Sequence, residues 1–586
     1  MYSYKLVSTC TILTLACGTL SYADSHENGT AAYPMDAAQT CALTQTTFDA
    51  DWTKITFPNT AGNPLAGMSL GPVYATDSGL VYIFPPDGPA FTDSTDQPTD
   101  CAFHKWSAQM FLWLTSSVDD VAEIPTNPGP PSSDTDYVFA SEFFYRLEGF
   151  DTLVPQGATE INLTPLARDE KNIDSIGQAG FTNGVLFFEV DTETESQSDL
   201  VYYDIHVSRP YGYVVAANNA ADSPLFNQFL QNRAESCVAI AYGIENDYFG
   251  GSGSQTRIEA ALLSNLFCSE FIALPSGFGS DVSEVEQDAE SPTGGAPVSL
   301  RAAEAAIDYL AMTMELKTSW VRADSLAAPG DYIQQSGTVP VYGPNDDGTW
   351  SQTGEETVDL AMIGMHVVGS VADHPEMIWA TFEHVGNAPD VTYPYVNASG
   401  DIAEFTNLSD TPNDMWLLSD GTFAPTIREY AVTRAVEGGP DIIVPSPSAG
   451  GAPLDTPTNV NRLNPWGSDP STASAADNNS MVISTNTAVL AALNAAYGDA
   501  DISDPRRNYI LTGSSWGHNG MFPTGNDVSQ IAGTPAMANT TMETFQQADF
   551  DGSGDREGCF TCHGINPGDS GFDVSHIFSG ITTVEE

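Results

Sequence analysis

Short segments with the apolar–polar alternation typical of β-strands recur along the chain, and few segments have helical spacing. The alternating segments cover residues 72–75, 79–84, 184–191, 200–207, 360–368, 377–385 and 508–512. Two pairs of them are separated by turn-forming residues and predict antiparallel hairpins, one from 184–191 and 200–207, the other from 360–368 and 377–385.

Three segments predict helices. Residues 101–116 place large apolar side chains at helical spacing and predict a buried helix, with His104 and Lys105 at its edge. Residues 300–316 are rich in alanine and leucine, and residues 484–497 form a similar but weaker pattern. Strands interleave with these helices without regular βαβ alternation, so we expect an α+β fold with a β-rich antiparallel body, a few helices and long loops.

Length and composition divide the chain further. With 586 residues it exceeds a single ordinary core, and the acidic, Gly/Pro-rich stretch 280–297 is a boundary candidate. We therefore expect β-rich regions at 24–290 and 291–540. Residues 541–586 are too few to form a domain and are expected to pack on the body as a short segment.

The charge balance excludes one class of function. The chain has 18 Lys+Arg against 77 Asp+Glu, a net charge of −59. Such a surface repels nucleic acid, so we expect no nucleic-acid partner. Solubility in saline surroundings explains the acidity, and docking of a cationic partner is the alternative.

The N-terminus predicts export. Lys5 precedes an apolar run over 6–20, and small residues end at Ala23, so we expect a signal peptide over 1–23 and a periplasmic or secreted protein. Cleavage before Cys17, as in a lipoprotein, fits poorly because Thr14 stands where an aliphatic residue is usual. No other run is long and apolar enough to span a bilayer, so the mature chain is expected to have no membrane span.

The motif with the clearest chemistry is Gly558-Cys559-Phe560-Thr561-Cys562-His563-Gly564. Cys-x-x-Cys-His is the attachment signature of c-type haem: the two thiols form thioethers to the porphyrin, and the histidine ligates the iron. A zinc site would need a second ligand pair, which does not follow, and a thioredoxin-like dithiol expects a βαβ context. The sequence therefore predicts one covalent haem c on Cys559 and Cys562, with His563 as proximal ligand.

The remaining cysteines predict disulfides. Cys10 and Cys17 leave with the signal peptide, so four cysteines stay in an oxidising compartment. Of the three connectivities, nearest-neighbour pairing is preferred here: Cys41–Cys101 and Cys237–Cys268.

Other residues near the motif are candidate ligands. His576 is the preferred sixth iron ligand; the alternatives are Met537, Met542, His518, Met521 and an open site. Asp549, Asp551, Ser553 and Asp555 match the start of a calcium loop, but Phe560 stands where the closing glutamate belongs. The alternative for that stretch is an acidic, glycine-rich turn.

Two further patterns are weak. His366, Glu383 and His384 belong to the 360–385 hairpin; with a turn at 370–375, His366 would face Trp379, too far from His384 to share a metal ion. The Gly-x-Ser-x-Gly pattern over 513–517 follows a strand but lacks the helix that a serine hydrolase needs.

Three blocks carry a resemblance to a known family. They are the helix at 101–116, the pair 360–368 and 377–387, and the run 538–547 with Cys559–His563 and 575–578. Together they resemble large, poorly characterised bacterial monohaem proteins grouped with the cytochrome c family. The resemblance implies a haem-attachment role for Cys559 and Cys562 and a proximal-ligand role for His563.

These observations predict an exported monohaem protein that transfers single electrons between redox partner proteins. The body is larger than an electron carrier needs, so the alternative is a haem-dependent oxidoreductase or a gas or redox sensor with an open haem site. A third class is a binding or structural protein in which haem stabilises the fold.

Overall fold

A computed structural model describes the fold of part of the chain. The described ranges are 32–41, 100–115, 137–140, 144–148, 200–208, 211, 314–371, 374–413, 415–423, 431–436, 439–446, 458–497, 504–518, 521–524, 528–544, 558–564, 574–575, 577 and 583–584, with short strands between residues 55 and 200. The expected signal peptide over 1–23, Cys237, Cys268, His576 and the candidate calcium-loop stretch lie outside these ranges.

Fourteen described strands form one sheet, which confirms the predicted α+β class with a β-rich body. Its main path is β21 (Ile531–Gly533), β20 (Tyr509–Gly517), β15 (His374–His384), β14 (Trp350–Val371), β12 (Met314–Arg322), β11 (Tyr202–Ser208), β5 (Phe144–Glu148), β6 (Thr152–Pro155) and β22 (Thr583–Val584). Beside this path lie β13 (Gln334–Pro344), β7 (Ile161–Asn162), β18 (Ala431–Val436), β19 (Gly439–Pro445) and β8 (Gly184–Val185). All the pairings are antiparallel except β13–β7 and β22–β6.

Four two-stranded sheets complete the described strands: β1 (Ile55–Thr56) with β2 (Ser69–Leu70), β3 (Val73–Tyr74) with β4 (Val81–Tyr82), β9 (Phe187–Val190) with β10 (Gln197–Leu200), and β16 (Tyr393–Val396) with β17 (Ile402–Phe405). Within the described residues, the helices are α2 (Asp100–Leu114), α8 (Ala475–Tyr497) and the short α9 (Cys559–His563), besides several 3-10 turns. None of the helices in these ranges is both long and apolar enough to cross a membrane.

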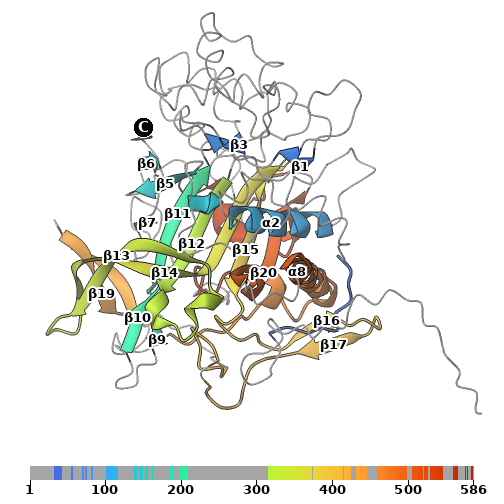
Figure 1. Ribbon diagram of the computed structural model, residues 1–586. Coiled ribbons are helices and arrows are strands. Elements are labelled where there is room, and N and C mark those ends of the chain that lie inside the picture. The colour runs from blue at the N-terminus through green and yellow to red at the C-terminus, as the bar shows by residue number, and fades with distance from the viewer. Residues whose placement is uncertain are drawn as a thin grey trace, which may run out of the picture.

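Helices α2 and α8 cover one face of the large sheet (Figure 1). Phe111 of α2 stacks on Phe382 of β15, with ring centroids 4.4 Å apart, and Phe103 stacks on Trp516 of β20 at 3.9 Å. Asn486 of α8 donates to the backbone O of Leu511 at 2.8 Å. These contacts confirm the predicted buried helix at 101–116, but His104 is fully buried rather than at its edge.

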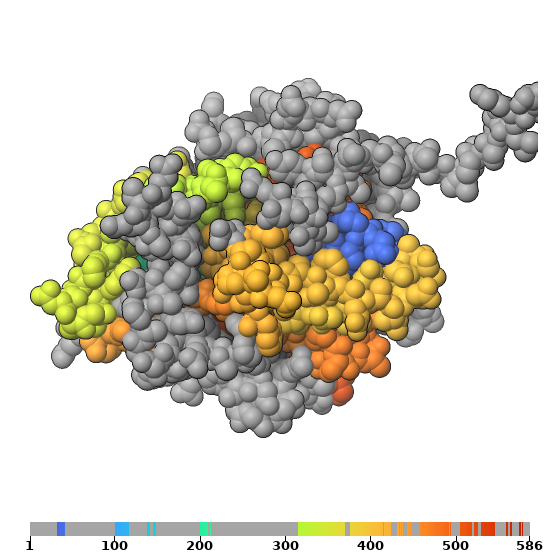
Figure 2. All heavy atoms as spheres, turned by 90° about the horizontal axis from the view of Figure 1, so that it is seen from below, coloured from blue at the N-terminus to red at the C-terminus, as the bar shows by residue number. Residues whose placement is uncertain are grey.

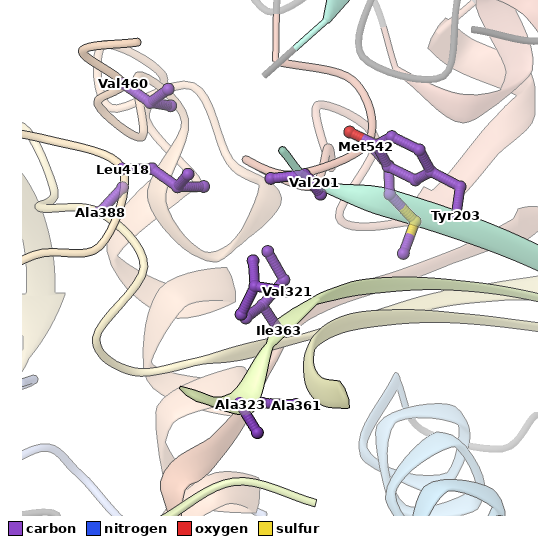
Figure 3. Packing of buried hydrophobic residues seen from close by; sticks show 10 residues of the cluster. All are labelled: Val201, Tyr203, Val321, Ala323, Ala361, Ile363, Ala388, Leu418, Val460 and Met542. Carbon is purple, nitrogen blue, oxygen red and sulfur yellow. The ribbon is translucent and has the colours of Figure 1, made fainter. Parts of the chain in front are cut away.

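The opposite face of the sheet is covered by the chain's C-terminal part and by loops. A buried cluster on this side is drawn in Figure 3: Val201, Tyr203, Val321, Ala323, Ala361, Ile363, Ala388, Leu418, Val460 and Met542. The Met542 side chain lies beside the Tyr203 ring in that view. Residues only 17 positions before the haem motif therefore belong to the core of the sheet.

One predicted disulfide is present. Cys41 and Cys101 are bonded, which joins the N-terminal stretch 32–41 to the start of α2. The same stretch pairs with the β16–β17 hairpin, since Ala38 N donates to Val396 O at 2.8 Å. Figure 2 shows it in blue beside the gold-coloured segment that contains this hairpin.

Two strand pairings differ from prediction. The 184–191 segment pairs through β9 with β10, while the 200–207 segment continues as β11 into the large sheet, between β5 and β12. The 360–385 hairpin is confirmed, but His366 lies opposite Thr381 rather than Trp379, because a register shift between Gly369 and Val371 displaces the pairing by two residues. Strands from both expected β-rich regions share one sheet through the β11–β12 pairing.

Candidate haem site

The haem-attachment motif forms a short helix, α9. Residues three and four apart on a helix share a face, so the backbone places Cys559, Cys562 and His563 on one side. The Cys559 side chain is partly exposed. Helical backbone at the motif thus supplies the side-by-side arrangement that two thioether bonds and an iron ligand require.

The His563 ring is oriented by a backbone carbonyl. Its Nδ1 lies 2.7 Å from the O of Val574, which follows it by 11 residues in the chain. A carbonyl oxygen only accepts, so Nδ1 carries the hydrogen and Nε2 carries the lone pair. Metal-binding histidines are commonly fixed by such a hydrogen bond, and here it leaves Nε2 as the ring nitrogen that could ligate a metal.

An aromatic side chain of the central sheet packs on the same ring. The centroids of Trp379 and His563 lie 4.2 Å apart, with the planes inclined by 41°. Trp379 also contacts Phe560, the residue inside the motif, at 5.8 Å. Phe560, inside the motif, and Val574, whose carbonyl contacts His563, are each 1% exposed, so apolar side chains are buried beside the motif.

The segment preceding the motif is held in the sheet by buried hydrogen bonds. Asn539 Nδ2 donates to Thr381 Oγ1 at 2.8 Å and to the O of Phe382 at 3.1 Å. Thr540 donates twice to the Glu383 carboxylate, through its backbone N at 2.9 Å and through its hydroxyl. All these groups are buried. Residues 539 and 540, in the C-terminal part of the chain, are therefore built into the fold of the large sheet.

A charged cluster holds the same segment further along. Glu543 Oε1 lies 2.7 Å from His366 Nε2 and 3.8 Å from Lys317 Nζ. Burial opposes the charged form of Glu543, but the charge and hydrogen bond of His366, together with Lys317, outweigh it and lower the pKa of this carboxyl. His366 thus anchors the chain 16 residues before Cys559.

The segment following the motif is also anchored. The Tyr211 hydroxyl donates to Ser575 Oγ at 2.7 Å, and Ser575 Oγ donates to Glu315 at 2.5 Å. Strand β22 then pairs with β6 at the far edge of the sheet. The motif is consequently tied to the body on both sides.

Near the Thr540 contact lies a buried ionic group. Arg462 contacts Glu383 at 3.1 Å and Asp390 at 3.2 Å, and it donates to the O of Ala388 at 2.6 Å. All three charged side chains are at most 5% exposed. Burial raises the pKa of Asp390 to about 6, although Arg462 acts in the opposite direction.

The structure places the candidate sixth ligands in different surroundings. Met542 packs beside Tyr203 in the core cluster, and the Met537 thioether lies against Gly513 of β20. Met537 and Met542 are buried, whereas Met521 is 53% exposed and His518 is exposed. The preferred candidate, His576, lies outside the described residues, as do Asp549, Asp551, Ser553 and Asp555.

The weaker patterns are structural. His384 stacks on Tyr332 at 3.8 Å, whereas His366 binds Glu543, so the two imidazoles are not brought together. The described ranges contain no group of three or more His, Cys, Asp or Glu that could hold a metal ion. The Gly-x-Ser-x-Gly residues all lie within strand β20 and form no strand-to-helix elbow.

Two contacts of the site were not predicted. Trp379 was assigned only to a hairpin, although its alternation with Thr381 and Glu383 places these three residues on one face of β15. The Val574 carbonyl has no sequence signal, because any residue supplies one.

Comparisons of the chain with family models, curated proteins and solved structures found no match.

Proposed function

We propose that the protein is an exported c-type cytochrome-like protein that binds one haem covalently through Cys559 and Cys562 and transfers single electrons. The observation that carries the proposal is the His563 Nδ1–Val574 O hydrogen bond, at 2.7 Å, in a helix that also carries the two cysteines. If the motif occurred by chance, there would be no reason for the His563 imidazole to be held in one tautomer. When bound, the haem supplies the one-electron Fe(III)/Fe(II) couple.

Residues of the chain itself hold His563 in place and limit the access of water to its ring. The buried residues Phe560 and Val574 lie in and beside the motif. The anchors at Thr540 and Ser575 keep it at the sheet on both sides. A ligand fixed in this way reorganises little when the iron changes charge, which favours electron transfer to and from redox partner proteins.

The test is expression with export and c-type haem maturation. We expect one haem per chain in the pyridine haemochrome assay, resistant to acid–acetone extraction. The Cys559→Ala/Cys562→Ala variant is expected to lose the covalently bound haem completely. His563→Gln is expected to retain the thioethers but change the absorption spectrum. A mature wild-type chain without covalent haem contradicts the proposal.

Carbon monoxide separates the proposed function from its alternative. A reduced spectrum unchanged by carbon monoxide supports a six-coordinate electron-transfer haem. Rapid carbon monoxide binding supports an oxidoreductase or sensor with an open site. The His576→Ala variant tests the preferred sixth ligand in the same assay: an unchanged spectrum removes that assignment.

A further inference from the structure

One strand of the central sheet contacts the C-terminal part of the chain at three successive positions of one face. In β15, Glu383 accepts from Thr540, Thr381 accepts from Asn539, and Trp379 packs on His563. Alternate residues of a strand point to the same side, so these three contacts form a row. The first two fix the chain before the motif; the third reaches the motif's histidine.

We propose that Trp379 is a positioning residue for His563: it fixes the plane of the imidazole and so couples the haem ligand to the central sheet. This inference rests on the proposed function. The two described contacts of the ring act on different parts of it. The hydrogen bond to Val574 O fixes the Nδ1 edge, and the indole lies against a ring face at a centroid distance of 4.2 Å. Both contacts oppose rotation about the Cβ–Cγ bond, the hydrogen bond by holding Nδ1 and the indole by blocking one face of the ring.

Trp379 is itself held in place. Its Nε1–H donates to the O of Glu376 at 3.0 Å, and the side chain is 6% exposed. The Glu376 carboxylate accepts from the backbone N of Gly517 at 2.9 Å, which ties this end of β15 to β20. The indole therefore offers a fixed surface rather than a mobile neighbour.

The backbone beside Trp379 has an uncommon conformation. Met377, two residues earlier, has φ of +66° and is fully buried. Residues other than glycine adopt this region at a free-energy cost and keep it only where the surroundings impose it; such residues cluster at functional sites. Here the conformation lies between Glu376, whose carbonyl accepts from the indole, and Trp379 itself.

The first test needs no haem. In the Cys559→Ala/Cys562→Ala protein with labelled histidine, the His563 ring resonance, assigned by its loss in His563→Gln, is expected to be displaced by the indole ring current. Trp379→Leu is expected to return it toward the random-coil position, while Trp379→Phe retains part of the displacement. Trp320→Leu is the matched control, since Trp320 is fully buried but contacts Phe139 instead.

The second test uses the haem-loaded protein. Imidazole in solution competes with His563, and we expect the half-saturating imidazole concentration to fall about 2- to 10-fold in Trp379→Leu, with partial rescue in Trp379→Phe and no change in Trp320→Leu. An unmoved resonance overturns the proposal. So does a moved resonance with unchanged competition, because the contact would then be packing alone. If the wild type carries no haem, the proposed function fails, and the first test still decides whether Trp379 positions the ring.

Discussion

Replacing Arg462 by Met is expected to lower the free energy of unfolding by about 3–5 kcal/mol, because it leaves two buried carboxylates without their cation. Glu383 and Asp390 contact the guanidinium at 3.1 and 3.2 Å, and Arg462 and both carboxylates are almost completely excluded from water. Methionine preserves much of the apolar side-chain volume, so the loss is that of charge and hydrogen bonds rather than a large cavity.

The matched control is Arg322→Met. Arg322 also contacts two carboxylates, Asp324 at 3.2 Å and Glu356 at 2.8 Å, but those acidic side chains are 69% and 52% exposed. Water screens such a pair, so we expect a loss below about 1 kcal/mol. Urea denaturation of the two variants and the wild type measures the difference; equal losses would contradict the assigned role of the buried group.

The Arg462→Met variant also tests how the large sheet and the C-terminal part of the chain are connected. Glu383 accepts from Arg462 and from Thr540, so loss of the guanidinium changes the charge environment of the carboxylate that holds residue 540. We expect Arg462→Met to make the segment before the haem motif more sensitive to limited proteolysis than Arg322→Met does. Loosening of the haem motif would then follow from a change far from it in sequence.

Local patterns predicted much of the fold. The helix at 101–116 and the 360–385 hairpin were predicted because one stripe or one face of each is apolar over many residues. Helix α8 begins nine residues before its predicted start. These residues were not predicted to be helical because the first turns bury polar side chains. Ser480, for example, is buried and hydrogen-bonded to the backbone N of Val396, so no apolar period marks it.

Strand β14 extends beyond prediction for a related reason. It begins at Trp350, and its first part pairs with β13 where Glu355 and Glu356 are exposed. Residues 353–357 are all exposed, so this part of β14 has no buried face that would produce an alternating pattern in the sequence. The pairing of β11 with β12 was missed because more than 100 residues separate the two strands.

The candidate site was predictable only in its chemistry. Cys559, Cys562 and His563 form a motif of fixed spacing, so the sequence alone indicates them. Their supports are distant: Trp379 is 184 residues before His563, and Glu383 is 157 residues before Thr540. Such contacts depend on which face of β15 the C-terminal part crosses, and a single sequence does not contain that information.

The second large effect that we expect is a dependence of the free energy of unfolding on pH. His104 is fully buried against Trp516, and among the described residues neither of its ring nitrogens has a hydrogen-bond partner. Burial lowers its pKa from 6.5 to about 4. Above pH 6.5 the residue is neutral in both states. Between pH 6.5 and 4 the unfolded chain binds a proton that the folded chain does not, so stability falls as the pH falls.

The size of this effect follows from the shift. One pKa unit corresponds to about 1.4 kcal/mol, so His104 is expected to remove about 3 kcal/mol between pH 7 and pH 4. Other buried groups also titrate in this range: burial and Arg146 lower the pKa of His206 to about 3, and burial raises that of Asp204 to about 7. These two act in opposite directions and remain present in a His104 variant.

His104→Leu is therefore expected to flatten the pH dependence without abolishing it. Urea denaturation at intervals from pH 7 to pH 4 should show the variant losing about 3 kcal/mol less than the wild type, whatever its absolute stability at pH 7. Parallel curves for wild type and His104→Leu would show that the folded protein accommodates a proton on His104. Helix α2 would then have to open at this point, where Phe103 and His104 pack on Trp516 at the end of β20.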